Sequence, residues 1–230
     1  MMLSTIPKKR SLEPVRLSAS IYQCMKSEIL TGAIKPGESL LELQLAKRFD
    51  CSQSPVREAC LHLSNEGLLK ASPYKGYTVT EITIKEIKEL YQLRLIIECA
   101  VVEMAAQNAS AFPDVLAEME HTVEVHRRGF DSTTLVEFID AEVCFHVAIA
   151  RMSDNGRLLK IVMESFGHFQ RFYYKILPLQ GARSYDEVST AEHAEILDQI
   201  RKQNCSGVRN LMHDHIIRGR EHALELYFGS

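Results

Sequence analysis

Residues 36–79, PGESLLELQLAKRFDCSQSPVREACLHLSNEGLLKASPYKGYTV, decide the fold of the N-terminal part of the chain. Apolar residues recur at helical spacing from Leu41 to Phe49 and, after a three-residue turn, again from Val56 at positions i, i+3, i+4 and i+7. This periodicity predicts two short helices joined by a tight turn. Ser52 is a favourable N-cap for the second helix, and a proline lies in its first turn, where no intrahelical hydrogen bond is lost.

The segments on either side of these two helices complete a small domain. Apolar residues recur every four positions before Gly32 and predict a preceding helix with a stop. After the helices, the β segments 68–72 and 76–80 flank a turn and predict a hairpin. Three helices followed by a hairpin are typical of a winged helix-turn-helix. We predict this domain over residues 14–80, behind a flexible basic arm over residues 1–13.

From Thr83 onward the sequence has only helical periodicity. Thr83 and Glu86 form a capping-box pair at the start of the first helix, and Asp131 is expected to cap the third. The first predicted helix covers about residues 84–108, and the second begins at residue 113. The other four cover about residues 132–152, 155–176, 185–202 and 206–228. Six helices with short connections predict an all-α six-helix bundle over residues 84–228. The fold class is therefore mainly α, with two domains.

The composition excludes several classes of protein. With 230 residues, 46% of them apolar and 25% charged, the chain is not collagen-like, low-complexity or largely disordered. No stretch approaches the roughly 18 apolar residues of a membrane span, and the N-terminus lacks the apolar core of a signal peptide. The six cysteines are scattered without a C-x-x-C pair, which favours reduced thiols. We therefore expect a cytoplasmic protein with no membrane partner.

The charge of the chain is distributed unevenly. Residues 1–80 carry 11 Lys and Arg against 7 Asp and Glu, a net charge of +4, while the remainder has a net charge of −7. A basic N-terminal part suits a polyanion such as DNA, and an acidic remainder suits a partner or sensor domain.

Five short motifs resemble, in order, the DNA-binding domain of the GntR family of bacterial transcription regulators. They are Pro36-Gly37, Leu45-Ala46, the run Ser54-Pro55-Val56-Arg57-Glu58-Ala59, Glu66-Gly67-Leu68 and Lys75-Gly76. The resemblance covers about residues 14–80. It implies a homodimer on double-stranded operator DNA, with the third helix of each subunit in the major groove and the wing near the minor groove.

The residues expected to contact DNA lie mainly at the start of the third helix, where backbone N–H groups favour phosphate. Arg57, one turn further and off the apolar stripe, can bind O6 and N7 of guanine; the alternative is a salt bridge to Glu58 or Glu42. The family commonly has Arg at the position of Gln53 and often at the position of Leu43, so part of the usual contact set is absent here. Gln53 either pairs with adenine or merely covers the backbone. The candidate DNA-binding residues are Arg48, Ser52, Gln53, Ser54, Arg57, Lys75 and Gly76, with Arg48 and Lys75 on backbone phosphates.

Four weaker motifs in residues 84–228 together resemble the FCD domain, the ligand-binding domain of the FadR subgroup of the same family. They are Y-x-x-R-x-x-x-E (Tyr91, Arg94, Glu98), F-H followed by Asn155 (Phe145, His146), E-H-x-x-I-L (Glu192, His193, Ile196, Leu197) and a late helix with His215. The resemblance implies a dimerising helical domain that binds an effector and a metal ion.

Helical spacing places three histidines inside the bundle. His146, His193 and His215 each continue an apolar stripe on a separate helix, and Glu142 lies four residues before His146 on the same face. A single histidine on such a stripe is usually a packed core residue, but three with a carboxylate, in a family with this site, predict a metal centre. Zinc, nickel or manganese suit these ligands. The family normally has Asp at the Glu142 position, so Asp140 is an alternative ligand.

Arg94 lies on the buried stripe of its helix, and a buried guanidinium needs an anionic partner. That partner is either Glu98, four residues further on, or the carboxylate of a small effector, and we take Arg94 as the effector-binding candidate. His213 is expected to point away from the metal site. Four other histidines are expected at the surface or in packing positions: His121, His126, His168 and His222.

We therefore predict a transcriptional regulator, acting as a repressor and not as an enzyme. Its operator affinity would depend on a small organic acid bound at the metal site of the C-terminal domain. Two alternatives stay open: a metal-dependent enzyme acting on a small carboxylate, and a regulator with a closed, purely structural metal. The enzyme is disfavoured because the sequence contains no separate nucleophile or general-base motif.

Overall fold

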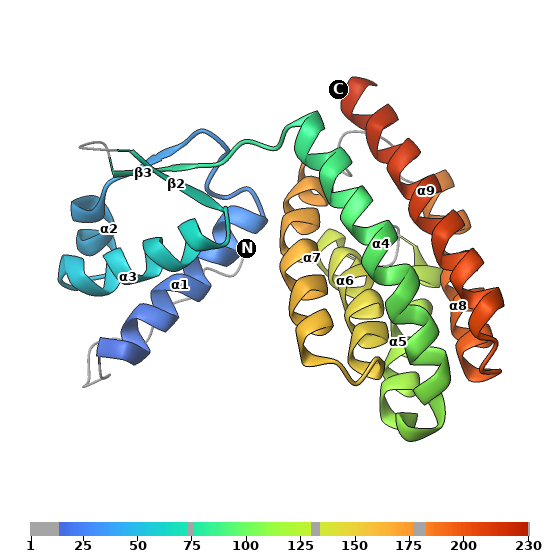
Figure 1. Cartoon of the computed structure of the whole chain (residues 1–230). Helices are drawn as coiled ribbons and strands as arrows, with labels where there is room; N and C mark the ends of the chain where they lie inside the picture. Colours follow the sequence, from blue (N-terminus) through green and yellow to red (C-terminus); the bar gives the residue numbers. More distant parts are fainter. Residues whose placement is uncertain (1–13, 73–75, 130–133, 177–182, 230) are drawn as a thin grey trace. The chain divides into compact units, whose positions relative to one another are not determined.

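The computed structural model describes residues 14–72, 76–129, 134–176 and 183–229, which are mainly helical with one small sheet (Figure 1). The chain divides into two compact units, with the boundary between Ile82 and Thr83. Within these ranges no single helix is long and apolar enough to cross a membrane. One pair among the described helices, Ile84–Ala111 and Pro113–Arg128, bent by 119°, meets the length and composition of a span together.

The first unit is the predicted winged helix-turn-helix. Its elements are α1 (Pro14–Leu30), β1 (Ser39–Leu40), α2 (Glu42–Arg48), α3 (Gln53–Asn65), β2 (Leu69–Ser72) and β3 (Gly76–Val79). The strands form an antiparallel sheet in the order β1-β3-β2, in which Tyr77 pairs with Leu40 on one side and with Ala71 on the other. The hairpin confirms the sequence prediction, whereas β1 is too short to leave an alternating pattern in the sequence.

The apolar stripes of α1 and α3 meet in the core of this unit. Ile21 and Met25 of α1 and Val56 and Leu63 of α3 are fully buried. The opposite face of α3 is thereby left exposed. Ser52 occupies the N-cap position of α3 as predicted, but its side chain makes no capping hydrogen bond there.

The start of strand β3 depends on a glycine. Gly76 has φ +76°, a left-handed conformation, and a Cβ at this position would lie 2.3 Å from the carbonyl oxygen of Leu40. Any side chain would therefore strain the backbone and push β1 away from β3.

The second unit is the predicted all-α bundle. Its helices among the described residues are α4 (Ile84–Asn108), α5 (Pro113–Arg128), α6 (Leu135–Met152), α7 (Gly156–Ile176), α8 (Arg183–Arg201) and α9 (Cys205–Gly229), with a short 3-10 helix η1 (Ala109–Ala111) after α4. Helix α4 packs along α9 and also contacts α6, α7 and α8 (Figure 1). Side chains on the inner face of α4 therefore reach the interior of the bundle.

Capping explains where two of these helices begin. Thr83 Oγ1 accepts a hydrogen bond from the backbone N–H of Glu86 at the start of α4, as predicted. The predicted start of α6 is wrong, because the helix begins at Leu135 behind a complete capping box of Thr134 and Glu137. Asp131, the predicted cap, lies outside the described residues.

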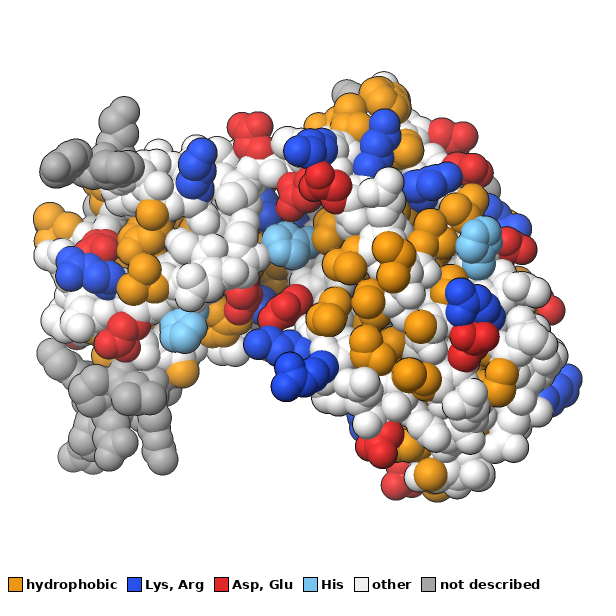
Figure 2. Space-filling model, in the orientation of Figure 1, with side chains coloured by type: hydrophobic (Ala, Val, Ile, Leu, Met, Phe, Trp, Pro, Cys, Tyr) orange, Lys and Arg blue, Asp and Glu red, His pale blue; other side chains and the backbone are white. Residues whose placement is uncertain are grey.

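Apolar side chains also reach the surface of the second unit. Figure 2 shows them gathered on the visible face of this unit. Helix α4 contributes the exposed side chains of Leu93, Ile96 and Met104, and α7 contributes Met163. The three residues of α4 lie on one side of the helix, since they are spaced by three and eight positions.

Candidate functional site

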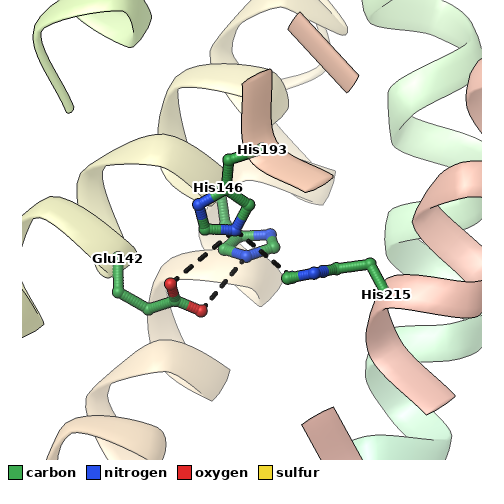
Figure 3. Close-up of side chains that lie close together, drawn as sticks. All are labelled: Glu142, His146, His193 and His215. Atoms are coloured by element: carbon green, nitrogen blue, oxygen red, sulfur yellow. Dashed lines mark hydrogen bonds and ion pairs between the residues drawn. The ribbon is translucent and has the colours of Figure 1, made fainter. Parts of the chain in front are cut away.

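Four side chains from three helices converge inside the second unit (Figure 3). Glu142 and His146 extend from α6, one turn apart, while His193 comes from α8 and His215 from α9. One candidate ligand atom from each residue lies within 4.8 Å of the others. Each of these residues is at most 5% exposed. The structure therefore brings together the four residues that the sequence nominates as metal ligands.

The atoms that face one another are carboxylate oxygens and imidazole nitrogens. Glu142 Oε1 lies 3.5 Å from His146 Nε2, and Glu142 Oε2 lies 3.7 Å from His193 Nε2 (Figure 3). His193 Nε2 is 3.3 Å from His215 Nε2. Among the described residues, Glu142 Oε1 has no hydrogen-bond partner. The cluster thus offers several electron-rich atoms to one small volume.

Two further carboxylates fix how two of the histidines are protonated. His146 Nδ1 is 2.6 Å from Glu98 Oε2, and His215 Nδ1 is 2.8 Å from Glu192 Oε2. An ionised carboxylate only accepts hydrogen bonds, so we assign the proton to each Nδ1, which leaves the Nε2 lone pair directed toward the cluster. Metal-binding histidines usually have such a partner on their second nitrogen.

Burial and neighbouring charges largely favour the protonation states that a metal ion requires. Burial lowers the pKa of His193 well below its ordinary value and also lowers the pKa of His215. Burial opposes ionisation of Glu142, but His193 and His146 outweigh it and hold the pKa of Glu142 well below its usual range. The pKa of His146 is raised, because Glu98 outweighs burial. Neutral imidazoles and an ionised carboxylate are the forms that bind metals.

This set of donors fits a divalent metal ion. Imidazole suits zinc and nickel, and carboxylate suits manganese as well. His193 Nε2 and His215 Nε2 lie 3.3 Å apart, close enough for both to bind one ion. Glu142 and the three Nε2 atoms would hold the ion, and the ion would supply positive charge for an anionic ligand.

Arg94 of α4 lies beside the cluster and is 3% exposed. Its Nε donates to Glu98 Oε1 at 2.5 Å, and its Nη2 lies 3.2 Å from His146 Nε2. Its guanidinium lies over the rings of Phe166 and Phe169, 4.6 and 4.8 Å from their centroids. The ion pair with Glu98, one of the two alternatives from the sequence, is therefore formed. It leaves the effector-binding alternative open, because the guanidinium also reaches the cluster.

The charges around Glu98 stabilise its ionised form. Burial would raise the pKa of Glu98, but Arg94 and His146 outweigh it and lower this pKa to about 2. Glu98 is thus the anion that neutralises the buried guanidinium and orients a candidate metal ligand.

Sequence reasoning misses the roles of three residues around the cluster. Glu98 appears in the sequence only as a possible partner of Arg94, although its spacing of four residues from Arg94 places both on one helix face. Glu192 directly precedes His193 in the E-H motif, yet nothing in the motif indicates that it contacts His215. Motif membership was the available signal for both carboxylates.

His126 of α5 is the third such residue. It was expected at the surface or in a packing position, and it is indeed buried, with its ring 4.7 Å from that of Phe138. Its Nδ1 also lies 3.3 Å from Nδ1 of His193, which the sequence does not indicate. Burial lowers the pKa of His126. Its spacing from buried Met119 and Val123 predicts burial, but not the contact with His193.

Asp140 and the remaining histidines lie away from the cluster. Asp140 is exposed, and its Oδ1 accepts a hydrogen bond from Gln170 Nε2 at 3.3 Å, so Glu142 rather than Asp140 faces the histidines. The other histidines of the second unit are exposed or half-buried: His121, His168, His213 and His222.

The candidate DNA contacts of the first unit gather at the exposed start of α3. Ser52, Gln53 and Ser54 are exposed there, and Arg57 is exposed one turn further along. Arg57 donates to Glu42 Oε2 of α2 through Nε at 3.1 Å and through Nη2 at 2.8 Å. The salt bridge that the sequence offers as an alternative to base contact is therefore formed.

The other candidate DNA contacts flank this end of α3 in the sequence. Arg48 forms an ion pair with Glu28 of α1 and remains partly exposed. Gly76 begins β3, and Lys75 lies outside the described residues. Leu43, where the family often has Arg, is 55% exposed on α2. This chain thus has an exposed apolar side chain at a position where members of the family often have a basic one.

Two family profiles match the chain. The profile described as bacterial regulatory proteins, gntR family, matches residues 17–79, and the profile of the FCD domain matches residues 89–218. The chain belongs to the GntR family. Its first unit carries the helix-turn-helix domain of this family and its second unit an FCD domain, which is consistent with the FadR subgroup.

Similar proteins carry the names of transcriptional regulators. The uncharacterized HTH-type transcriptional regulator YdhC of Bacillus subtilis is 31% identical over 91% of this GntR-family chain and 92% of its own length. The HTH-type transcriptional repressor RspR of Escherichia coli is 25% identical over 87% and 86%, respectively. The solved structure of E. coli McbR/YncC superposes with a TM-score of 0.78 at 21% identity, over 92% of this chain and 98% of that one, and shows a shared fold. The chain is therefore a GntR-family transcriptional regulator.

Proposed function

We propose that this regulator is a homodimeric repressor whose affinity for operator DNA is controlled by a small organic acid bound at a metal site in its FCD domain. The observation that carries the proposal is the buried cluster of Glu142 and three histidines with the Arg94 guanidinium beside it. The repressor role is supported by the name of the relative RspR. The two units would divide the work, with residues 14–80 on DNA and residues 84–228 sensing the effector.

In the DNA-binding unit, the start of α3 would approach the major groove. Its exposed N-terminal residues would contact phosphate, and Arg57 would exchange Glu42 for the edge of a guanine. Such an exchange is feasible because the Arg57 side chain is 59% exposed in its pair with Glu42. Arg48 and Lys75 would contact phosphates. Because this chain has Gln53 and Leu43 where the family commonly or often has Arg, its operator would differ in sequence from the operators of relatives that have these arginines.

In the sensing unit, the metal ion would be zinc, nickel or manganese. Four protein ligands in a six-coordinate ion would leave two positions for water or for oxygens of an effector. A carboxylate effector would face two positive groups, the ion and Arg94. Its negative charge would stabilise both of these buried positive charges. The polar histidines make a hydroxy acid or a dicarboxylic acid a better match than a plain fatty acid.

A metal-dependent enzyme and a closed structural metal predict different behaviour from a sensor. An enzyme would convert the acid that it binds, and a structural metal would leave operator affinity unchanged when acids are added.

Full-length protein purified without chelator should contain about one metal ion per chain by elemental analysis. A variant with both His193→Ala and His215→Ala should contain none. Unchanged metal content in that variant would place the metal elsewhere.

The effector can be sought by adding hydroxy- and dicarboxylic acids to the metal-loaded protein in a thermal unfolding assay. An acid that binds the native state should raise the melting temperature in a concentration-dependent way. The same acid should be recovered unchanged after prolonged incubation, as measured by mass spectrometry. Conversion of the acid would favour the enzyme instead.

A further inference from the structure

His126 of α5 lies next to the candidate metal ligands without being one of the four. It is 2% exposed, and its two ring nitrogens face different groups. Nε2 is 3.3 Å from the backbone carbonyl oxygen of Phe138, and Nδ1 is 3.3 Å from Nδ1 of His193. The imidazole therefore bridges the backbone of α6 and a side chain of α8.

The direction of these two hydrogen bonds follows from their partners. A backbone carbonyl can only accept, so Nε2 of His126 carries a proton. A doubly protonated, charged ring would have no carboxylate within hydrogen-bond distance among the described residues, since Glu142 Oε2 is 3.9 Å from Nε2. Burial disfavours such a charge. Nδ1 of His126 is therefore an acceptor, and the proton between the two Nδ1 atoms belongs to His193.

This assignment completes a pattern that the other two histidines already show. Glu98 and Glu192 accept hydrogen bonds from the Nδ1–H groups of His146 and His215, which leaves each Nε2 free to bind a metal. His193 has no carboxylate at Nδ1 among the described residues, and His126 is the acceptor there.

We propose that His126 is a positioning residue that holds His193 in the tautomer with a free Nε2, so that His193 can bind the metal ion. The inference rests on the proposed metal site, and it adds an outer residue to it. A neutral imidazole accepts less strongly than the carboxylates behind the other two histidines. His126 therefore holds its histidine less strongly than Glu98 and Glu192 hold theirs.

Two substitutions of His126 separate this role from packing. His126→Phe keeps an aromatic ring against Phe138 but has no acceptor, so the proton of His193 is free to move to Nε2 and block metal binding. His126→Asn loses the ring but places an acceptor oxygen near the position of Nδ1. A residue that only packs would tolerate Phe better than Asn, whereas the proposed role predicts the opposite order for metal affinity. His121→Phe, an exposed position on the same helix, is the matched control.

The test uses full-length protein freed of metal by a chelator and dialysis. Zn²⁺ affinity is measured by competition with a chromophoric chelator, and Co²⁺ absorption at saturation reports the ligand set. We expect His126→Phe to bind Zn²⁺ about 10- to 100-fold more weakly than wild type, His126→Asn to bind clearly more tightly than His126→Phe, and His121→Phe to match wild type. The saturated Co²⁺ spectrum should keep its band positions in all of them.

Three results would overturn the inference. These are wild-type Zn²⁺ affinity in His126→Phe, equal weakening in the Phe and Asn variants, and a saturated Co²⁺ spectrum in His126→Phe that indicates loss of a ligand, which would make His126 a ligand itself. Failure of the metal site as a whole is distinguishable. In that case wild type would bind no Zn²⁺, or the His193→Ala, His215→Ala variant would bind it as wild type does.

Discussion

Glu98 connects the two parts of the candidate sensing site through a single carboxylate. One of its oxygens accepts from Arg94 at 2.5 Å and the other from His146 at 2.6 Å, and all three residues are buried. Arg94 also reaches Nε2 of His146, the nitrogen that a metal ion would use. The guanidinium and a metal ion cannot both use that lone pair. Metal binding would therefore leave the outer end of Arg94 available for an anionic effector.

The stability of the second unit should depend strongly on Glu98. Glu98→Ala leaves the Arg94 guanidinium buried without its anion, which typically costs about 3–5 kcal/mol. Urea unfolding of the full-length protein, followed by far-UV circular dichroism, measures the loss in the bundle transition. Glu89→Ala is the control, because Glu89 lies on the same helix in an exposed pair with Lys85, and such pairs are worth less than about 1 kcal/mol. Equal small effects would contradict a buried ion pair.

Arg57 should matter for sequence recognition rather than for folding. If it binds a base edge, Arg57→Ala should raise the Kd for the operator roughly 5- to 150-fold and leave the melting temperature almost unchanged. An operator selected from a random DNA library, with anisotropy titrations, provides the measurement. Arg209→Ala in the second unit, which removes the same charge from an exposed pair with Glu103, should not change operator affinity. Wild-type affinity in Arg57→Ala would leave Arg57 as only the partner of Glu42.

Among the secondary-structure elements, the wing offers the sharpest prediction. Gly76 and Gly32 both have φ +76°, but a Cβ on Gly76 would meet Leu40 O at 2.3 Å while a Cβ on Gly32 would meet nothing within 4 Å. Gly32→Ala should therefore cost only the left-handed backbone penalty, about 1–2 kcal/mol. Gly76→Ala should cost clearly more and also weaken operator binding, since it displaces β1 from β3. Equal melting temperatures for the two variants would contradict the described wing.

The helices were largely predictable because their apolar residues recur at the helical period and their ends carry capping residues. The start of α6 shows how the choice of an N-cap residue from the local sequence can be wrong. Several residues before it are good caps, and only Thr134 has a glutamate three positions later that completes the box. Strand β1 could not be predicted, because two residues hold no period and its pairing with β3 is set by the fold. The contact of His126 with His193 could not be predicted either, because periodicity indicates that a side chain is buried but not which side chain it meets across the core.

For the molecule as a whole, the central requirement is thermodynamic linkage. An effector can weaken operator binding only if it prefers the conformation of the protein that binds DNA poorly. Helix α4 carries Arg94 and Glu98 and begins directly after the residues that follow the wing. A change at the candidate sensing site would therefore act on the helix that continues the chain from the DNA-binding unit.

The same helix provides a test of the proposed homodimer. Leu93, Ile96 and Met104 expose an apolar side of α4, and Ile96 is 71% exposed. If the second unit supplies the dimer contact through this side, Ile96→Glu should reduce the mass measured by light scattering at micromolar concentration from a dimer to a monomer. Val136→Glu, at an exposed apolar position on α6, should remain a dimer. A dimeric Ile96→Glu protein would place the contact on another surface.

The most direct test is the release of the operator by an acid as a function of metal and of Arg94. Metal-loaded wild-type protein is bound to its operator and titrated with hydroxy- and dicarboxylic acids, beside Arg94→Ala and the His193→Ala, His215→Ala variant. We predict that both variants bind the operator like wild type but no longer release it, that Arg94→Ala keeps its metal, and that the double variant has lost it. Release of the operator from Arg94→Ala or the metal-free double variant at the same acid concentration as from wild type would contradict the account.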